Sequence, residues 1–348
     1  MIAMLMAAGA AFAVTVLFTP FLIRRLRVLG IGQQIRDDGP IEHPHAAKAG
    51  TPTMGGIAIV LATVVGYLFA HIRRHAIAFA TPGWALIALI AGLGFVGWID
   101  DYLGVRARRN MGLRKRGKTL GIVVVAALFA WLAVYFVHTD THLSFTRPLH
   151  VDLGRVGLFL WTIFVVYATA NAVNLTDGLD GLAAGSSAFT FAAFMIIAFT
   201  EFRHPLIYGV LPAQALDQAV VAAAMFGACA GFLWWNAAPA RIFMGDTGSL
   251  AIGGAMGGLA LLTRTHLLLP LLAGLPAIET LSVIAQVVSY RGFRRRILRM
   301  APIHHHFEVG GWSEFTVIVR FWLFAGICVS LGIGIFYADF LRHGVNLG

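Results

Sequence analysis

The sequence is poor in charged residues and in cysteine. Only 12% of its 348 residues are Asp, Glu, Lys or Arg, whereas 59% are hydrophobic, and the mean hydropathy is +0.80. A soluble globular domain carries about 25% charged residues, so the composition excludes that class and indicates an integral membrane protein. Cys229 and Cys328 both lie in apolar runs, which gives no disulfide framework and no zinc spacing.

The sequence also lacks the alternating ten-residue segments of a transmembrane β-barrel, soluble insertions and convincing internal repeats. Apolar runs of helical length recur instead. At about 20 residues per span, they predict an all-α polytopic membrane protein, with a single transmembrane domain over residues 1–348. The ten predicted helices cover residues 2–21, 53–70, 84–99, 119–137, 156–173, 183–200, 217–235, 248–264, 267–290 and 317–337. Pro270 and Pro276 predict a kink or a break in the ninth.

Positive charge is distributed unevenly between the loops, and 18 of the 26 Lys and Arg residues lie on one side of the predicted helices. The loops of that side cover about residues 22–52, 100–118, 174–182, 236–247 and 291–316. The positive-inside rule makes them cytoplasmic and both termini external. The net charge of +10 is then explained by topology and anionic lipid headgroups, so we predict no nucleic-acid partner.

Four polar side chains mark the boundary between the fifth and sixth apolar runs. Asn171, Asn174, Asp177 and Asp180 recur every third residue, so adjacent members are neighbours on a helix. An ionised carboxylate in hydrocarbon costs several kcal/mol unless it has partners. A helix-end turn would need one capping residue and not four, so we favour a binding site here.

Two adjacent carboxylates, Asp100 and Asp101, end the third apolar run. Like charges side by side repel unless a cation or a proton lies near them. The pair therefore suits a magnesium site or a base beside one, with a solvated helix terminus as the plainer alternative. Lys118 opens the fourth run, where it can meet a phosphate or an anionic headgroup.

Residues 243–249, Phe-Met-Gly-Asp-Thr-Gly-Ser, open the eighth run a few residues after Asn236. Asp246 either caps this helix or binds magnesium, while the neighbouring hydroxyls and the helix N-terminus face phosphate oxygens. Phe243 and Asn236 could stack on and hydrogen-bond a nucleobase, although an aromatic residue in such a loop is more often packed.

Three consecutive histidines, His304, His305 and His306, follow Pro302. Adjacent side chains point in different directions and rarely chelate one zinc ion, so we favour hydrogen bonding to phosphate. Lys48 precedes the second run and is either a phosphate contact or part of a helix start. Glu279 lies inside the ninth run, where a charge needs a partner; no role can be assigned to it.

Together these stretches resemble the polyprenyl-phosphate N-acetylhexosamine-1-phosphate transferase superfamily. The resemblance lies in residues 48–56, 99–102, 171–182, 243–249 and 300–308, spread over almost the whole chain. The sequence Ala-Pro-Ile-His-His-His-Phe-Glu is similar to that of the phospho-N-acetylmuramoyl-pentapeptide transferase branch. That branch has ten transmembrane helices, external termini and a cytoplasmic active site. Gly104 departs from it, because relatives commonly have lysine there.

The resemblance implies transfer of phospho-MurNAc-pentapeptide from UDP-MurNAc-pentapeptide to undecaprenyl phosphate in a bacterial inner membrane, giving lipid I and UMP with Mg²⁺. It implies that Asp246 and Asp177 hold Mg²⁺ and that Asp100, beside Asp101, is the base. Residues that would shape the nucleotide pocket or contact phosphates are Asn171, Asn174, Asp177, Asp180, Lys48, Lys118, His304, His305 and His306.

Two other functions stay open at this point. One is a related transferase that uses UDP-N-acetylglucosamine. The other is an ion or solute transporter, because Asp, His and Glu279 at a membrane edge fit a cation path. A conduction path, however, needs polar residues through the whole depth of the membrane, and these crowd one face. Direct attack or a covalent intermediate, and a monomer or a homodimer, are both left open.

Overall fold

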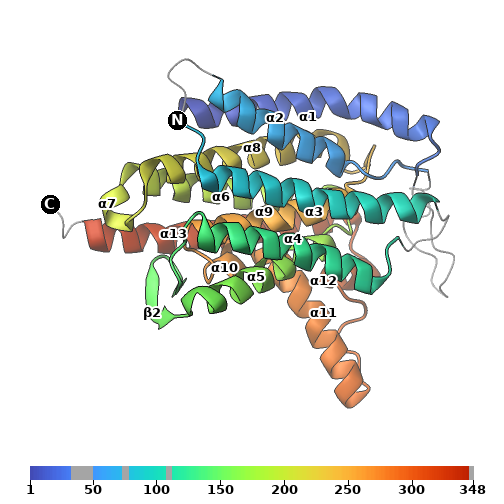
Figure 1. Cartoon of the computed structure of the whole chain (residues 1–348). Coiled ribbons are helices and arrows are strands. Elements are labelled where there is room, and N and C mark those ends of the chain that lie inside the picture. The colour runs from blue at the N-terminus through green and yellow to red at the C-terminus, as the bar shows by residue number, and fades with distance from the viewer. Residues whose placement is uncertain (33–49, 73–77, 107–111, 345–348) are drawn as a thin grey trace.

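In a computed structural model, residues 1–32, 50–72, 78–106 and 112–344 are described, and they form a bundle of long helices (Figure 1). The long helices are α1 (Ile2–Val28), α2 (Gly56–His71), α3 (Thr81–Arg106), α4 (Lys115–Tyr135), α5 (Gly154–Thr176), α6 (Leu182–Arg203), α8 (Pro212–Asn236), α9 (Gly245–Leu262), α11 (Gly274–Phe293) and α13 (Glu314–Gly344). The short ones are α7 (Pro205–Tyr208), α10 (Leu269–Leu272) and α12 (Ile303–Val309). Strands β1 (His142–Ser144) and β2 (Pro148–Asp152) pair antiparallel, His142 opposite Asp152.

Each predicted apolar run coincides with a long helix, and the all-α polytopic class is confirmed. Among the described residues, seven helices are long and apolar enough to cross a membrane. They are α1, α3, α4, α5, α6, α8 and α13. Helix α2 is shorter, with 16 residues, and α9 and α11 are outside this set. The structure thus establishes a multi-pass membrane protein and does not by itself fix the number of spans at ten.

The ninth predicted run is broken into two helices. Helix α10 ends at Leu272, α11 begins at Gly274, and Ala273 between them has φ −107° and ψ 45°, outside the helical region. Pro276 lies in the first turn of α11, where a missing N–H removes no hydrogen bond within the helix. The predicted break is therefore confirmed, and it lets α11 project away from the bundle (Figure 1, orange).

Helix α9 lies at the centre of the bundle. Every residue from Thr247 to Leu262 is buried, and the helix packs against α3 and α5. Its first turn, which carries Asp246, emerges at one end of the bundle beside the last turns of α3 and α5. The opposite end holds the start of α1, the end of α13, α7 and the hairpin (Figure 1). We call these two regions the site end and the terminal end.

Candidate active site

Asp246 is the centre of a polar cluster drawn from four helices. Its Oδ2 accepts a hydrogen bond from Nζ of Lys118, in the first turn of α4. Its Oδ1 accepts one from Nδ2 of Asn174, near the end of α5. Lys118 Nζ also lies 3.7 Å from Oδ2 of Asp100 on α3. The structure therefore brings together four predicted site residues that are up to 146 positions apart in the sequence.

Asp101 points to the back of this cluster and caps α9. Its Oδ1 accepts the N–H of Asp246 at 3.0 Å, and its Oδ2 accepts the N–H and the hydroxyl of Thr247 at 3.0 and 2.6 Å. The first amides of a helix have no partner inside the helix. Because Asp101 of α3 satisfies them, Asp246 is not needed as a cap and its carboxylate is free to face Lys118 and Asn174.

Asp100 keeps one oxygen for the cluster and uses the other for support. Its Oδ1 accepts the N–H of Leu113 at 2.7 Å, which fixes the side chain between α3 and the start of α4. Its Oδ2 is the atom nearest to Lys118. A carboxylate held in this way can accept a proton on the oxygen that faces the cluster.

Residues 52–56 and 243–244 form one wall of the site. Three backbone hydrogen bonds of 2.8 Å join them. Gly56 is required there because a Cβ would lie 2.0 Å from the backbone nitrogen of Gly248. Gly245 has φ +70°, and a Cβ on it would lie 2.6 Å from Asp101 Oδ2. Residues 52–56 and 243–244, which are far apart in the sequence, thus pack as one structural unit. Lys48 lies outside the described residues.

Asp180 and Asn236 hold the loops of the site together. Asp180 is buried, and its Oδ2 accepts the N–H of Ala240 at 2.9 Å. The amide of Asn236 accepts the N–H of Gly181 at 3.0 Å and donates to the carbonyl of Ile242 at 2.9 Å. Asn236 is only 2% exposed, so both ends of this side chain are engaged in positioning backbone.

Asp177 ends α5 beside the same cluster and is partly buried. Its burial, together with the negative charges of Asp246, Asp101 and Asp180, raises the pKa of its carboxyl well above the usual value. Within the described ranges, Asp100 and Asp246 share one cationic side chain, that of Lys118.

This donor set suits Mg²⁺. The ion prefers oxygen ligands and usually takes one or two protein carboxylates, leaving its other positions to phosphates and water. Across the part of the chain that the structure describes, no three His, Cys, Asp or Glu side chains converge as a complete set of ligands. A magnesium ion held by Asp246 and Asp177 would thus depend on substrate phosphates to complete its coordination.

His304 is the histidine that packs against the turn after α5. Its side chain is fully buried, and its Nδ1 lies 3.1 Å from Oε2 of Glu279 on α11. Among the described residues, neither ring nitrogen of His304 and neither carboxylate oxygen of Glu279 forms a hydrogen bond. On the other side of the ring, a Cβ on Gly178 would lie 2.3 Å from Nε2. His304 therefore lies between Glu279 and the 177–181 turn, which supplies the partner that the sequence required for Glu279.

The other two histidines point elsewhere, as their adjacency predicts. His305 Nδ1 lies 2.7 Å from Oε2 of Glu308, one turn further along α12. His306 Nδ1 accepts the N–H of Arg299 at 3.0 Å. The first contact lies within α12, and the second holds α12 against the segment that precedes it. Direct contact with a phosphate stays a prediction for these two residues.

Asn171 and Phe243 lie at the edge of the cluster. Asn171 donates to the carbonyl of Tyr167, within its own helix, at 2.7 Å. Phe243 is partly buried, and its backbone belongs to the wall formed with residues 52–56. Their predicted roles toward a nucleotide stay predictions.

Sequence reasoning missed the contacts of Leu113 and Glu314, and it named Ser249 only as a cap or a phosphate contact, not as a partner of Asn174. Ser249 Oγ accepts from Asn174 at 2.9 Å, and its place three residues after Asp246 on one helix could have indicated a shared face. Glu314 Oε1 accepts the N–H of Asp180 at 3.2 Å. The contact of Glu314 with Asp180 and the backbone contact of Leu113 with Asp100 join segments that are separated in the sequence. No local sequence pattern predicts them.

Comparison with known proteins agrees with this geometry. Residues 83–264 match glycosyl transferase family 4, and residues 48–60 match signature 1 of phospho-N-acetylmuramoyl-pentapeptide-transferase. The protein of that name from Frankia alni is 49% identical, with 98% of each chain covered. Those from Saccharopolyspora erythraea and Corynebacterium kroppenstedtii are 47% and 45% identical, with at least 97% of each chain covered. The chain belongs to the phospho-N-acetylmuramoyl-pentapeptide-transferase family.

The two matched ranges cover complementary parts of the site. The glycosyl transferase family 4 match runs from α3 to just beyond α9, so it contains the cluster around Asp246. The match to the phospho-N-acetylmuramoyl-pentapeptide-transferase signature contains residues 52–56, which are hydrogen-bonded to residues 243–244. The family-specific segment and the segment shared with glycosyl transferases thus meet in one wall.

Proposed function

We propose that this chain transfers phospho-MurNAc-pentapeptide from UDP-MurNAc-pentapeptide to undecaprenyl phosphate, giving lipid I and UMP. The single observation that carries the proposal is the convergence of Asp100, Lys118, Asn174 and Asp246 from four helices at one end of a membrane bundle. Membership of the phospho-N-acetylmuramoyl-pentapeptide-transferase family supports the choice of substrates. All these residues belong to one transmembrane catalytic domain.

The reaction joins two anionic phosphates. An oxygen of the lipid phosphate forms a bond to the phosphorus that carries the sugar, and the bond between the two phosphates of the nucleotide breaks to release UMP. When bound, Mg²⁺ supplies charge neutralisation on the phosphates, and Asp246 and Asp177 are the residues that would hold it.

The other side chains act on position and charge. Lys118 brings a cation to the phosphates, and Asn174 orients Asp246 through one of its two carboxylate oxygens. Asp101 holds the first turn of α9 in place through three hydrogen bonds. Asp100 Oδ2 faces Lys118 and would accept the proton of a lipid phosphate that arrives protonated.

Orientation in the membrane is part of the proposal. All ten long helices cross a bacterial plasma membrane, the terminal end is external, and the site end faces the cytoplasm, where UDP-sugars are available. The loops predicted to be cytoplasmic carry 18 of the 26 Lys and Arg residues, as the positive-inside rule requires.

The test is an assay of the purified full chain in detergent with defined substrates. UMP release is expected only when UDP-MurNAc-pentapeptide, undecaprenyl phosphate and Mg²⁺ are all present, and chelation should abolish it. UDP-N-acetylglucosamine in place of the first substrate should give no product. Equal turnover of both nucleotide sugars, or solute flux in liposomes without UMP release, would overturn the assignment.

A further inference from the structure

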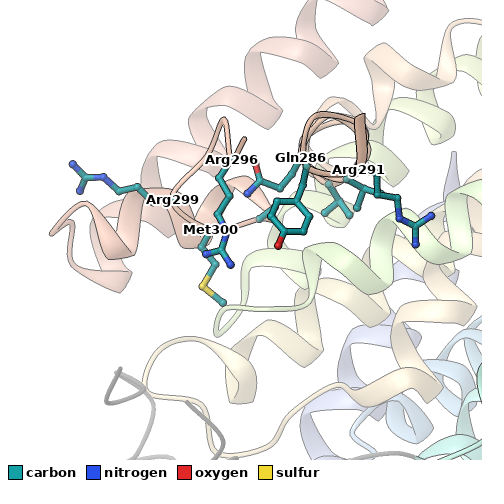
Figure 2. Close-up of a pocket in the computed structure, with 9 residues that line it drawn as sticks. Gln286, Arg291, Arg296, Arg299 and Met300 are labelled. Atoms are coloured by element: carbon teal, nitrogen blue, oxygen red, sulfur yellow. The ribbon is translucent and has the colours of Figure 1, made fainter. Parts of the chain in front are cut away.

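A basic hollow lies outside the active site, at the free end of α11. Its volume is about 470 Å³, and it is bounded by α11 and by the segment of residues 294–301 that follows it (Figure 2). Three arginines, Arg291, Arg296 and Arg299, lie in its wall with Tyr290 and Met300. None of these residues belongs to the mechanism described above.

The hollow has a defined shape because the segment of residues 294–301 is hydrogen-bonded to α11. Gln286 Oε1 accepts the N–H groups of Ile297 and Leu298 at 3.1 and 3.0 Å, and its Nε2 donates to the carbonyl of Leu298 at 3.1 Å. Ser289 Oγ donates to the carbonyl of Arg295 at 2.8 Å. The arginines are therefore displayed on a defined backbone and not on a loose tail.

Arg296 is the cation best placed for a ligand. Its side chain lies beside Met300, while Arg291 and Arg299 extend to opposite sides (Figure 2). Its guanidinium carbon is 6.0 Å from the centre of the Tyr290 ring. Among the described residues, neither Arg291 nor Arg296 forms an ion pair with a carboxylate. The hollow thus presents uncompensated positive charge with a phenol beside it.

The same end of α11 is strongly apolar on its outer surface. Ile284, Val288, Phe293 and Ile297 are between 52% and 74% exposed. An exposed apolar helix face that ends in arginines and a tyrosine is typical of the boundary between hydrocarbon and headgroups. A guanidinium binds phosphate oxygens in a bidentate manner.

We infer that this hollow binds the phosphodiester headgroup of an anionic bilayer phospholipid, and that the acyl chains of this lipid lie along the exposed face of α11. Arg296 and Tyr290 hold the phosphate, and Arg291 and Arg299 add positive charge on either side. The N–H of Arg299 donates to His306, so a lipid in the hollow also steadies the start of α12. The inference stands whether or not the proposed function is correct.

The test measures lipid binding and needs no turnover. The full chain in neutral detergent is titrated with phosphatidylglycerol or phosphatidylcholine, and retained lipids are counted by native mass spectrometry. We expect the chain to prefer phosphatidylglycerol and Arg296→Gln with Tyr290→Phe to bind it about tenfold more weakly, as for one lost charge-assisted hydrogen bond. The matched control removes Arg24, Arg25 and Arg27, all exposed at the end of α1, and should retain the preference.

Two outcomes would overturn the inference. One is equal retention of the two phospholipids by the parent chain, or equal retention of phosphatidylglycerol by parent and pocket variant. The other is displacement of phosphatidylglycerol from the hollow by undecaprenyl phosphate at a lower concentration, with the pocket variant raising the KM for that acceptor. The second result would assign the hollow to the lipid substrate.

Discussion

The two ends of the bundle both bury charged side chains, but they do so in opposite ways. At the terminal end, Asp217 accepts hydrogen bonds from His71 at 3.0 Å, from the Tyr67 hydroxyl at 3.1 Å and from the N–H of Ala80 at 3.1 Å. The other ring nitrogen of His71 lies 2.8 Å from the carbonyl of Tyr67. Both ring nitrogens of His71 thus face oxygen atoms, and each carboxylate oxygen of Asp217 has hydrogen-bond partners within the terminal end.

At the site end, the carboxylates of the cluster that the structure describes outnumber the described cation paired with them. Asp100, Asp101, Asp177 and Asp246 lie near one another with Lys118 as the cation between two of them. Like charges this close destabilise a fold, so packing gives no reason for the arrangement. The comparison teaches that a buried charge alone does not mark an active site. An excess of one sign, held in place by well-made supporting hydrogen bonds, does so.

The largest effect is expected from Asp246→Asn. The substitution removes the charge that faces Lys118 and the predicted metal ligand, and we expect turnover to fall about a thousandfold. The unfolding temperature in detergent should fall only slightly, because Asn keeps the volume and Lys118 still has Asp100 at 3.7 Å. UMP release measures the turnover, and a thermal melt of the same preparation measures the unfolding temperature. Near-normal turnover would show that Asp246 is not a catalytic residue.

The control for that experiment is its neighbour in the cluster. Asp101→Asn weakens the cap of α9, so it should lower the free energy of unfolding by about 1 kcal/mol. The pair of variants thus separates a residue that serves the reaction from one that serves the helix. Equal loss of stability in both variants would contradict this division.

At the terminal end, Asp217→Ala should act on stability and not on turnover. It leaves the buried Tyr67 hydroxyl, the His71 ring and the Ala80 N–H without their shared carboxylate partner, which costs about 3 kcal/mol. We expect a clearly lower unfolding temperature, and turnover per folded molecule within about twofold of the parent. Arg155→Gln, at an exposed position of the same end, should leave the unfolding temperature unchanged. If Asp217→Ala lost most of its turnover without a loss of stability, the terminal end would also serve the reaction, which would contradict the difference between the two ends.

A smaller effect is expected from Glu279→Gln. The carboxylate acts through His304, 3.1 Å away, so its loss should lower kcat about tenfold and shift the pH profile of turnover. Since Gln keeps the volume, the fold should hold. His304→Gln and the double variant, Glu279→Gln with His304→Gln, complete a double-mutant cycle. If these two variants have equal kcat, Glu279 acts through His304. Additive losses of kcat would contradict that role.

The smallest expected effect concerns Asp177 and pH. Its pKa is raised by burial and by neighbouring carboxylates, so the folded chain binds this proton more tightly than the unfolded chain does. Stability therefore falls as pH rises from the unfolded pKa toward the folded one. Asp177→Asn never ionises, and it should melt higher than the parent at about pH 8, with the gap closing toward about pH 4. If the difference in unfolding temperature between Asp177→Asn and the parent increased on acidification, the pKa of Asp177 would be lowered in the folded chain and not raised.

Much of this architecture could be read from the sequence. Hydropathy located the ten long helices, and Pro270 with Pro276 indicated the break before α11, because these signals act within one segment. The cluster of Asp100, Lys118, Asn174 and Asp246 was predicted as a set of separate motifs. Which of two adjacent carboxylates caps a helix and which faces the cluster depends on helix rotation, and that is decided by packing. For the same reason the pairing of Glu279 with His304 could not be predicted.

The direct contact between Gly56 and Gly248 has one more consequence. No side chain lies between α2 and α9 at that point, because a Cβ on Gly56 would meet the backbone of Gly248 at 2.0 Å. Rotamer changes therefore cannot widen this wall when a bulky donor arrives. Helix α12, in contrast, is joined to the segment before it by a side-chain contact, that of His306 with the N–H of Arg299, and it can adjust by turning a few torsions. Tolerance for different peptides on the donor should accordingly be altered by changes in α12 and not by changes in α2.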